Sequence, residues 1–220
     1  MAVKPAKGFV PYSTAIMKRT ITCQTEEGKA FLGNNRLDNI AVALFILDVT
    51  SRKRIARLQL RTKDHKAATK ALSKLFSDYE TEITNETTRI ETVLKAQKIN
   101  GRAQHNNPKT QDVEITTPEM KRIIDLLEAF DNLMILTDTI WLMGIIETEV
   151  AITFKKQHAA KLKRLFGQVY TLSKAAKKSA YIKDDSEVQA AIAQEEEKFG
   201  IKDETQNEPA SPAAAEEAAA

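Results

Sequence analysis

Near the start of the chain, polar side chains recur at every second position. They are Lys18, Thr20, Thr22 and Gln24. Alternation with period two is typical of a β-strand, in which successive side chains point to opposite faces. Lysine can donate hydrogen bonds to guanine, glutamine can pair with adenine, and the methyl group of threonine can contact thymine. The row therefore predicts a strand that reads base edges in the major groove of DNA, where a two-stranded ribbon fits.

Cations near this row are suited to binding phosphates, a role that positions a protein on DNA without reading its sequence. We expect this role of Arg19, Arg36, Arg52, Lys53, Arg54 and Arg57. A second group of basic residues lies in the segment 150–183, which holds nine Lys/Arg and no Asp/Glu. Its periodicity indicates a helix that is basic on one side. That helix is either a second phosphate contact or a face that only aids solubility.

The sequence contains no recognisable catalytic motif. The three histidines are far apart and lack the spacing of known metal motifs; they are His65, His105 and His158. We expect these to be surface or capping residues. None of the seven glycines forms a phosphate-binding loop, and there is no Gly-x-Ser-x-Gly motif. Three carboxylates recur at intervals of three and are interpreted as the solvent side of an amphipathic helix; they are Asp125, Glu128 and Asp131. We expect no catalysis, metal, cofactor or small-molecule substrate.

The net charge of +3 conceals four blocks of alternating sign. Residues 1–75 hold 15 basic and 5 acidic residues (+10), and residues 76–149 hold 7 and 14 (−7). Residues 150–183 carry +9, and residues 184–220, with 2 basic and 11 acidic residues, carry −9. Two basic regions suggest a polyanionic partner, because neutralising phosphates releases counterions. The alternative is a set of solvated helix faces.

Periodicity and turn residues define the elements that position these groups. A strand near 14–25 precedes a short turn or helix, a buried helix over 38–49, and a basic stretch over 51–62 that fits either helix or strand. A long helix follows over 63–99. After a loop at 100–110 come a short strand, a helix start at Thr117 and Pro118, and helical periodicity to about 178 with a possible break at Gly144. We expect a flexible arm (1–13), a mainly helical domain (14–183) and an acidic, largely disordered tail (184–220).

A lone strand leaves a pairing edge open, so the sequence suggests that the strand pairs with its copy in a second subunit. The alternative is internal pairing with residues 113–117. That second strand is less suited to contacting DNA, because Glu114 is negatively charged. The single cysteine, Cys23, is expected to be a small buried group in a reducing compartment. Trp141 is expected in the core or in a dimer interface. No stretch is long and apolar enough for a membrane span, and the N-terminus lacks a secretory signal, so we expect a cytoplasmic protein.

The order of these parts resembles the AcaB-like transcriptional activators of conjugative plasmids and integrative elements. The resemblance covers residues from about 12 to 180 and rests on the strand 16–22, the turn 25–33 and the helical block 118–141, which contains the run 126–133. It implies a ribbon-helix-helix-like, DNA-binding dimer that activates a promoter controlling conjugative transfer.

The sequence therefore predicts a mainly α protein with a short β-ribbon and a ribbon-helix-helix-like element embedded in a helical domain. Its expected function is sequence-specific binding of double-stranded DNA as a homodimeric transcription regulator. One alternative is a non-specific nucleic-acid-binding accessory protein of a mobile element. The other is a helical module that binds a protein partner.

Overall fold

The computed structural model describes residues 15–33, 36–58, 63–182 and 186–201. For residues 51–58, 63–69, 179–182 and 187 it describes the backbone alone. The elements are β1 (Met17–Cys23), α1 (Glu26–Lys29), α2 (Arg36–Leu58), α3 (Lys63–Ala96), β2 (Lys109–Ile115), α4 (Pro118–Leu142), α5 (Thr148–Ile182) and α6 (Ser186–Lys198). The predicted class, mainly helical with a short β-ribbon, is confirmed. The predicted arm lies outside the described residues, as does the tail from residue 202 onward.

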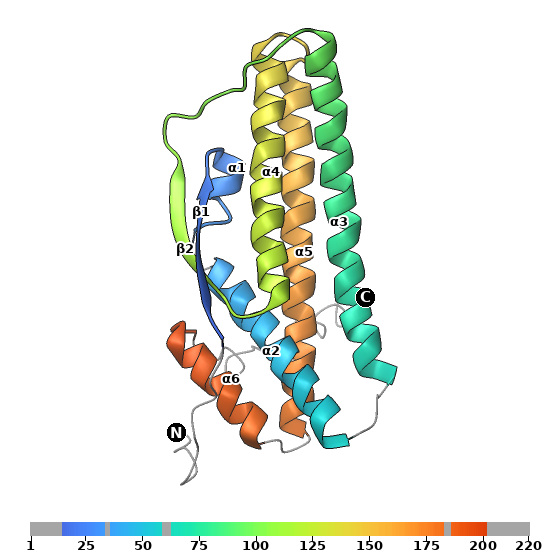
Figure 1. Ribbon diagram of the computed structural model, residues 1–220, viewed down its shortest axis with the longest axis vertical. Coiled ribbons are helices and arrows are strands. Elements are labelled where there is room, and N and C mark those ends of the chain that lie inside the picture. The colour runs from blue at the N-terminus through green and yellow to red at the C-terminus, as the bar shows by residue number, and fades with distance from the viewer. Residues whose placement is uncertain (1–14, 34–35, 59–62, 183–185, 202–220) are drawn as a thin grey trace, which may run out of the picture.

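Three long helices, α3, α4 and α5, form an elongated bundle, and the two strands lie along one side of it (Figure 1). The helix α2 crosses the lower part of α5, and α6 lies near α2 at the same end. One large apolar cluster fills the bundle, with Phe76, Phe130 and Leu133 fully buried. The basic stretch that fitted helix or strand is helical as far as Leu58, because it continues α2.

The strands form an antiparallel two-stranded sheet within one chain. In its register Lys18 faces Glu114, Thr20 faces Asp112 and Thr22 faces Thr110. The predicted strand and its alternation are confirmed, since Ile21 and Cys23 are fully buried while alternate residues are exposed. β2 occupies the pairing edge that the sequence suggested for a second subunit. The strand therefore pairs internally, as in the alternative, but its partner is the segment 109–115 and not 113–117.

A buried carboxylate ties the end of β1 to α4. Asp131 accepts hydrogen bonds from the backbone N–H groups of Gln24 (2.8 Å) and Thr25 (3.0 Å) and from the Thr25 hydroxyl (2.6 Å). Thr25 also caps α1 by accepting from the backbone N–H of Gly28 at 3.1 Å. A Cβ on Gly28 would lie 2.3 Å from Asp131 Oδ1, so this position requires glycine. The expectation that Asp131 lies on the solvent side is therefore wrong.

Both predicted boundaries of α4 are confirmed. Thr117 caps the helix by accepting from the Met120 N–H at 3.1 Å, and Pro118 stands in the first turn. At the other end Gly144 has φ +70°, a conformation that favours glycine and lets the chain reverse into α5. Helical packing also extends past the expected domain boundary at 183, because Val188 and Ile192 of α6 are buried in a second cluster with residues of α2.

Cys23 is buried, as expected. Burial raises the pKa of its thiol to about 12, so the reactive thiolate is suppressed at neutral pH. Within the part of the chain that the structure describes, no helix combines the length and apolarity needed to cross a membrane.

His158 is buried on α5, which corrects the expectation of a surface or capping histidine. Burial, only partly offset by Glu82, lowers its pKa below the ordinary value of 6.5. Near pH 6.5 the histidine therefore binds a proton in the unfolded chain but not in the folded chain. The free energy of unfolding should fall as pH drops through that value. We expect His158→Gln to flatten this dependence between about pH 7 and 5 in urea titrations. An unchanged pH slope in the variant would contradict the assignment.

Candidate nucleic-acid interface

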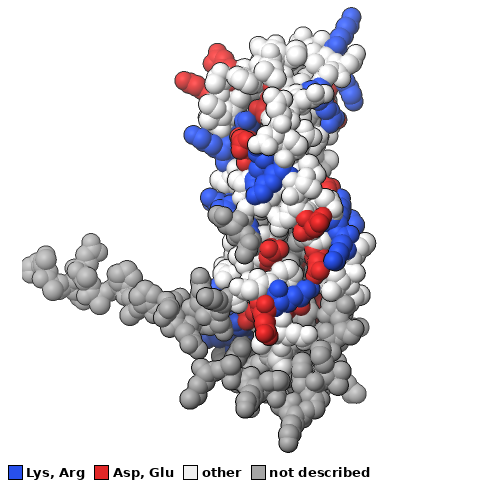
Figure 2. Space-filling view, turned by 90° about the vertical axis from the view of Figure 1, so that its left-hand side faces the viewer, with Lys and Arg blue, Asp and Glu red and all other residues white. Residues whose placement is uncertain are grey.

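The outward face of the ribbon carries acidic as well as basic groups. Lys18, Thr20 and Thr22 are exposed as predicted, but the Thr20 hydroxyl donates to Asp112 Oδ1 at 2.7 Å. Glu114 shares this face and is paired with Lys198 of α6. Figure 2 shows blue and red side chains intermixed on the side of the molecule where the strands lie. Lys18 and Lys198 stand against Asp112 and Glu114 on this face, so the face alone offers weak net attraction for phosphates.

The structure distributes the predicted phosphate contacts over separate places. Arg19 points toward α4, with Nη1 at 2.7 Å from Asp125 Oδ1 and Nη2 at 2.6 Å from Glu128 Oε2. Burial alone would raise the pKa of Asp125, but hydrogen bonds from Lys121 and Arg19 lower it. Arg36 donates to the backbone carbonyl of Ala30 at 2.9 Å. The side chains of the four remaining predicted contacts lie outside the described residues; they are Arg52, Lys53, Arg54 and Arg57.

Helix α5 carries an exposed row of cations, which we name the α5 cationic stripe. It consists of Lys156, Lys163, Arg164, Lys174 and Lys178. The four lysines follow one another at intervals of seven, eleven and four residues, which are close to whole helical turns, so they share one face of α5. Arg164, next to Lys163, lies at the edge of that face. The opposite face is buried through Leu162, Leu165 and Val169. From residue 156 to residue 178 an α-helix rises about 33 Å.

No ion pair neutralises the stripe among the residues that the structure describes. Its one aromatic contact is that of the Lys174 ammonium, 5.1 Å from the ring centroid of Tyr170. Gly167 lies between the cations with nothing within 4 Å of a Cβ placed there, so the surface is open. Three other α5 lysines are paired within the chain: Lys155 with Asp138 and Glu27, Lys161 with Glu82, and Lys177 with Glu196. Among the side chains that the structure describes, the stripe is therefore the unpaired part of the acid-free segment.

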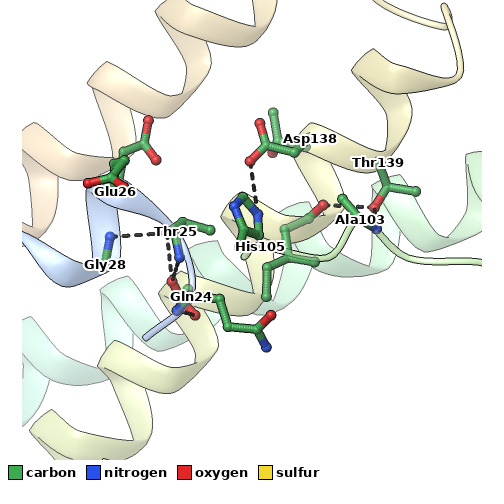
Figure 3. A network of polar contacts seen from close by, with 12 residues as sticks. Gln24, Thr25, Glu26, Gly28, Ala103, His105, Asp138 and Thr139 are labelled. Atoms are coloured by element: carbon green, nitrogen blue, oxygen red, sulfur yellow. Dashed lines mark hydrogen bonds and ion pairs between the residues drawn. The ribbon is translucent and has the colours of Figure 1, made fainter. Parts of the chain in front are cut away.

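A partly buried polar network anchors the first turns of α5. Lys155 Nζ lies 2.8 Å from Asp138 Oδ1 and 3.2 Å from Glu27 Oε1. Burial alone would lower the pKa of Lys155, but its hydrogen bonds and charge contacts with Asp138 and Glu27 raise it. His105 approaches the same Asp138 at 3.4 Å, and the Ala103 N–H donates to Thr139 (Figure 3). The network joins the loop before β2, α1, α4 and α5, and so fixes the orientation of the stripe.

Gln24 does not extend the polar row of the ribbon. It lines an open pocket of about 530 Å³ together with Arg102, His105 and Asn132. Arg102 is held there by Asn132 Oδ1 at 2.7 Å and Glu91 Oε1 at 3.0 Å. Across the described residues, no group of three His, Cys, Asp or Glu side chains is placed to hold a metal ion.

Sequence reasoning located the basic segment 150–183 but did not separate its paired from its unpaired lysines. The partners of the paired lysines lie on other helices, α1, α3, α4 and α6, at least 17 residues away in the sequence. The available signal was the heptad spacing of Lys156 and Lys163 on the face opposite the apolar positions.

These features define a class: a mainly helical protein with an intramolecular β-ribbon and one long helix that is cationic on its exposed face. A crystal structure of AcaB from uropathogenic E. coli has a similar fold. The TM-score is 0.72 and the sequence identity is 21%, and the match covers 85% of this chain and 100% of that one. No protein-family model matches the chain, and neither does any curated protein.

Proposed function

We propose that this protein binds double-stranded DNA and regulates transcription of conjugative-transfer genes, with the α5 cationic stripe as its main phosphate contact. The observation that carries the proposal is the stripe itself, a line of five exposed cations on one long helix that have no ion-pair partner among the described residues. The resemblance of the sequence to AcaB-like activators and the similar fold of AcaB support the assignment to transcription.

The dimensions of the stripe suit duplex DNA. Its length of about 33 Å is close to one helical turn of B-DNA, which is roughly 34 Å. DNA carries one negative charge per ~1.7 Å of axis, so each cation along the stripe finds a phosphate within reach of a long side chain. Binding releases counterions, and the affinity should fall steeply as salt rises.

The ribbon is the lesser contact in this proposal. Lys18 is available on its outward face, whereas the hydroxyl groups of Thr20 and Thr22 are hydrogen-bonded to Asp112 and Thr110. Base readout therefore rests on the Lys18 ammonium and the Thr22 methyl group, which lie toward opposite ends of β1, and phosphate binding rests on α5. A stripe that contacts phosphates alone reads no sequence. This observation favours the non-specific accessory protein as the second candidate.

The test uses the purified full chain. Genomic fragments that it retains are sequenced, and the affinity for a retained fragment is compared with that for a scrambled duplex across a salt series. We expect preference for the retained fragment, steep salt dependence, and loss of that preference in a Lys18→Ala/Thr22→Ala variant. Equal affinities for the retained fragment and for scrambled DNA would instead favour the second candidate, a non-specific nucleic-acid-binding protein. Binding that is absent or insensitive to salt would reject both nucleic-acid functions and favour the protein-interaction module.

A further inference from the structure

The upper end of the bundle exposes a cluster of large apolar side chains, which we name the apolar tip. It consists of Trp141, Leu142, Met143, Val150 and Ile152. Each is between 40% and 60% exposed, and together they are five of the eight large exposed apolar residues in the described chain. Single exposed apolar residues are common, but monomeric proteins rarely gather them into one patch. The tip therefore indicates a surface that another molecule covers when the protein is in its functional state.

The tip is preorganised. Trp141 Nε1 donates to Thr148 Oγ1 at 3.1 Å, which fixes the indole across the turn between α4 and α5. The backbone N–H groups of Met143 and Ile145 donate to carbonyls in the last turn of α4. Ile145 and Ile146 pack against the main core beneath the turn. A rigid tryptophan at the centre of an apolar patch is typical of the residues that dominate protein–protein binding energies.

Charges of both signs flank the tip. Glu147 and Glu149 are exposed at the start of α5, and Lys95 and Lys98 are exposed at the end of α3. Figure 1 shows the end of α3 beside the α4–α5 turn at the same end of the bundle. Within the described residues none of these four charges has an ion-pair partner. A two-fold axis that passes between the two flanks would bring the acidic flank of one copy to the basic flank of the other, because a two-fold interface uses the same surface twice.

We propose that the apolar tip is a homodimer interface, with a second copy of this chain as its occupant. The same surface supplies an apolar centre and two complementary flanks, which a self-complementary interface requires. The tip lies at the end of the bundle opposite α6, and the first cation of the α5 cationic stripe lies eight residues beyond the start of α5 (Figure 1). Ile152 lies one helical turn before Lys156, so such a dimer leaves the stripe accessible from Lys163 onward. The inference does not rest on the proposed DNA binding.

The experiment is sedimentation velocity of the full chain without DNA over a range of concentrations. We expect a reversible dimer, and we expect Leu142→Glu and Val150→Glu each to raise its dissociation constant by about 30-fold or more, the effect of losing a hot-spot residue. The matched control is Met17→Glu, because Met17 on β1 is 60% exposed, as Leu142 is. The control should leave the dimer intact, and circular dichroism should show that all three variants are folded.

Two further readouts address the geometry. Trp141 is the single tryptophan of the chain, so its emission should shift to shorter wavelength as concentration rises and the dimer forms. Lys98→Glu and Glu149→Lys should each weaken the dimer, and the double variant should recover most of the loss. A wild-type chain that stays monomeric at its highest soluble concentration would overturn the proposal. So would a dimer that Met17→Glu dissociates and the tip variants do not.

Discussion

Replacing Lys163 and Arg164 with alanine should lower the affinity for duplex DNA by about 60-fold at ~0.1 M salt. Each phosphate contact contributes about 0.9 to the slope of log affinity against log salt concentration. Two contacts are therefore worth a factor of about 60 between 1 M and ~0.1 M salt. The slope itself should fall by about two, as measured by fluorescence anisotropy at several salt concentrations.

The matched control removes two exposed positive charges from another helix. Lys70→Ala/Lys74→Ala on α3 changes the net charge by the same amount without touching the stripe. A general attraction between a basic protein and DNA would make the two double variants equivalent, and that result would contradict an interface on α5. Extending the first variant to Lys156 and Lys174 should reduce the slope by about four in total.

Asp131→Ala should destabilise the fold by about 3–5 kcal/mol, because it leaves two backbone N–H groups and one hydroxyl without their buried acceptor. The loss falls where β1 and α1 join α4, so the ribbon should lose protection in hydrogen exchange together with the drop in stability. Urea unfolding followed by circular dichroism measures the free energy.

Asp125→Ala on the same helix is the comparison. Asp125 also accepts hydrogen bonds, from Arg19 and Lys121, but its side chain is 42% exposed. Surface ion pairs of this kind contribute up to about 1 kcal/mol. Equal losses in the two variants would show that the burial of Asp131 does not determine its contribution.

The local features of this fold were predictable from the sequence because short-range physics determines them. The alternation of Ile21 and Cys23 with polar residues, the cap at Thr117 followed by Pro118, and the reversal at Gly144 each depend on a few neighbouring residues. The helix α3 matches the predicted span to within three residues at its end.

Long-range partners were not predictable in the same way. Asp131 has the spacing of a solvent-exposed carboxylate on α4, yet its donors lie 106 and 107 residues earlier in the chain. Arg19 was expected to face DNA, but it is paired with two carboxylates on α4. Periodicity predicts which face of a helix is polar, and it does not reveal which polar residues meet a partner from a distant element. The same limit left the paired and unpaired lysines of α5 undistinguished.

The pairing of β1 with β2 also bears on how the chain is made. Cys23 pairs with Lys109, so 86 further residues (109 − 23) must be synthesised before β1 can begin to pair with β2. At roughly 5–20 residues per second a ribosome needs about 4–17 s for this stretch. During that interval β1 leaves the exit tunnel with its apolar face uncovered and both edges open, which favours aggregation. The nascent protein should therefore depend on holding chaperones more than a bundle of consecutive helices would.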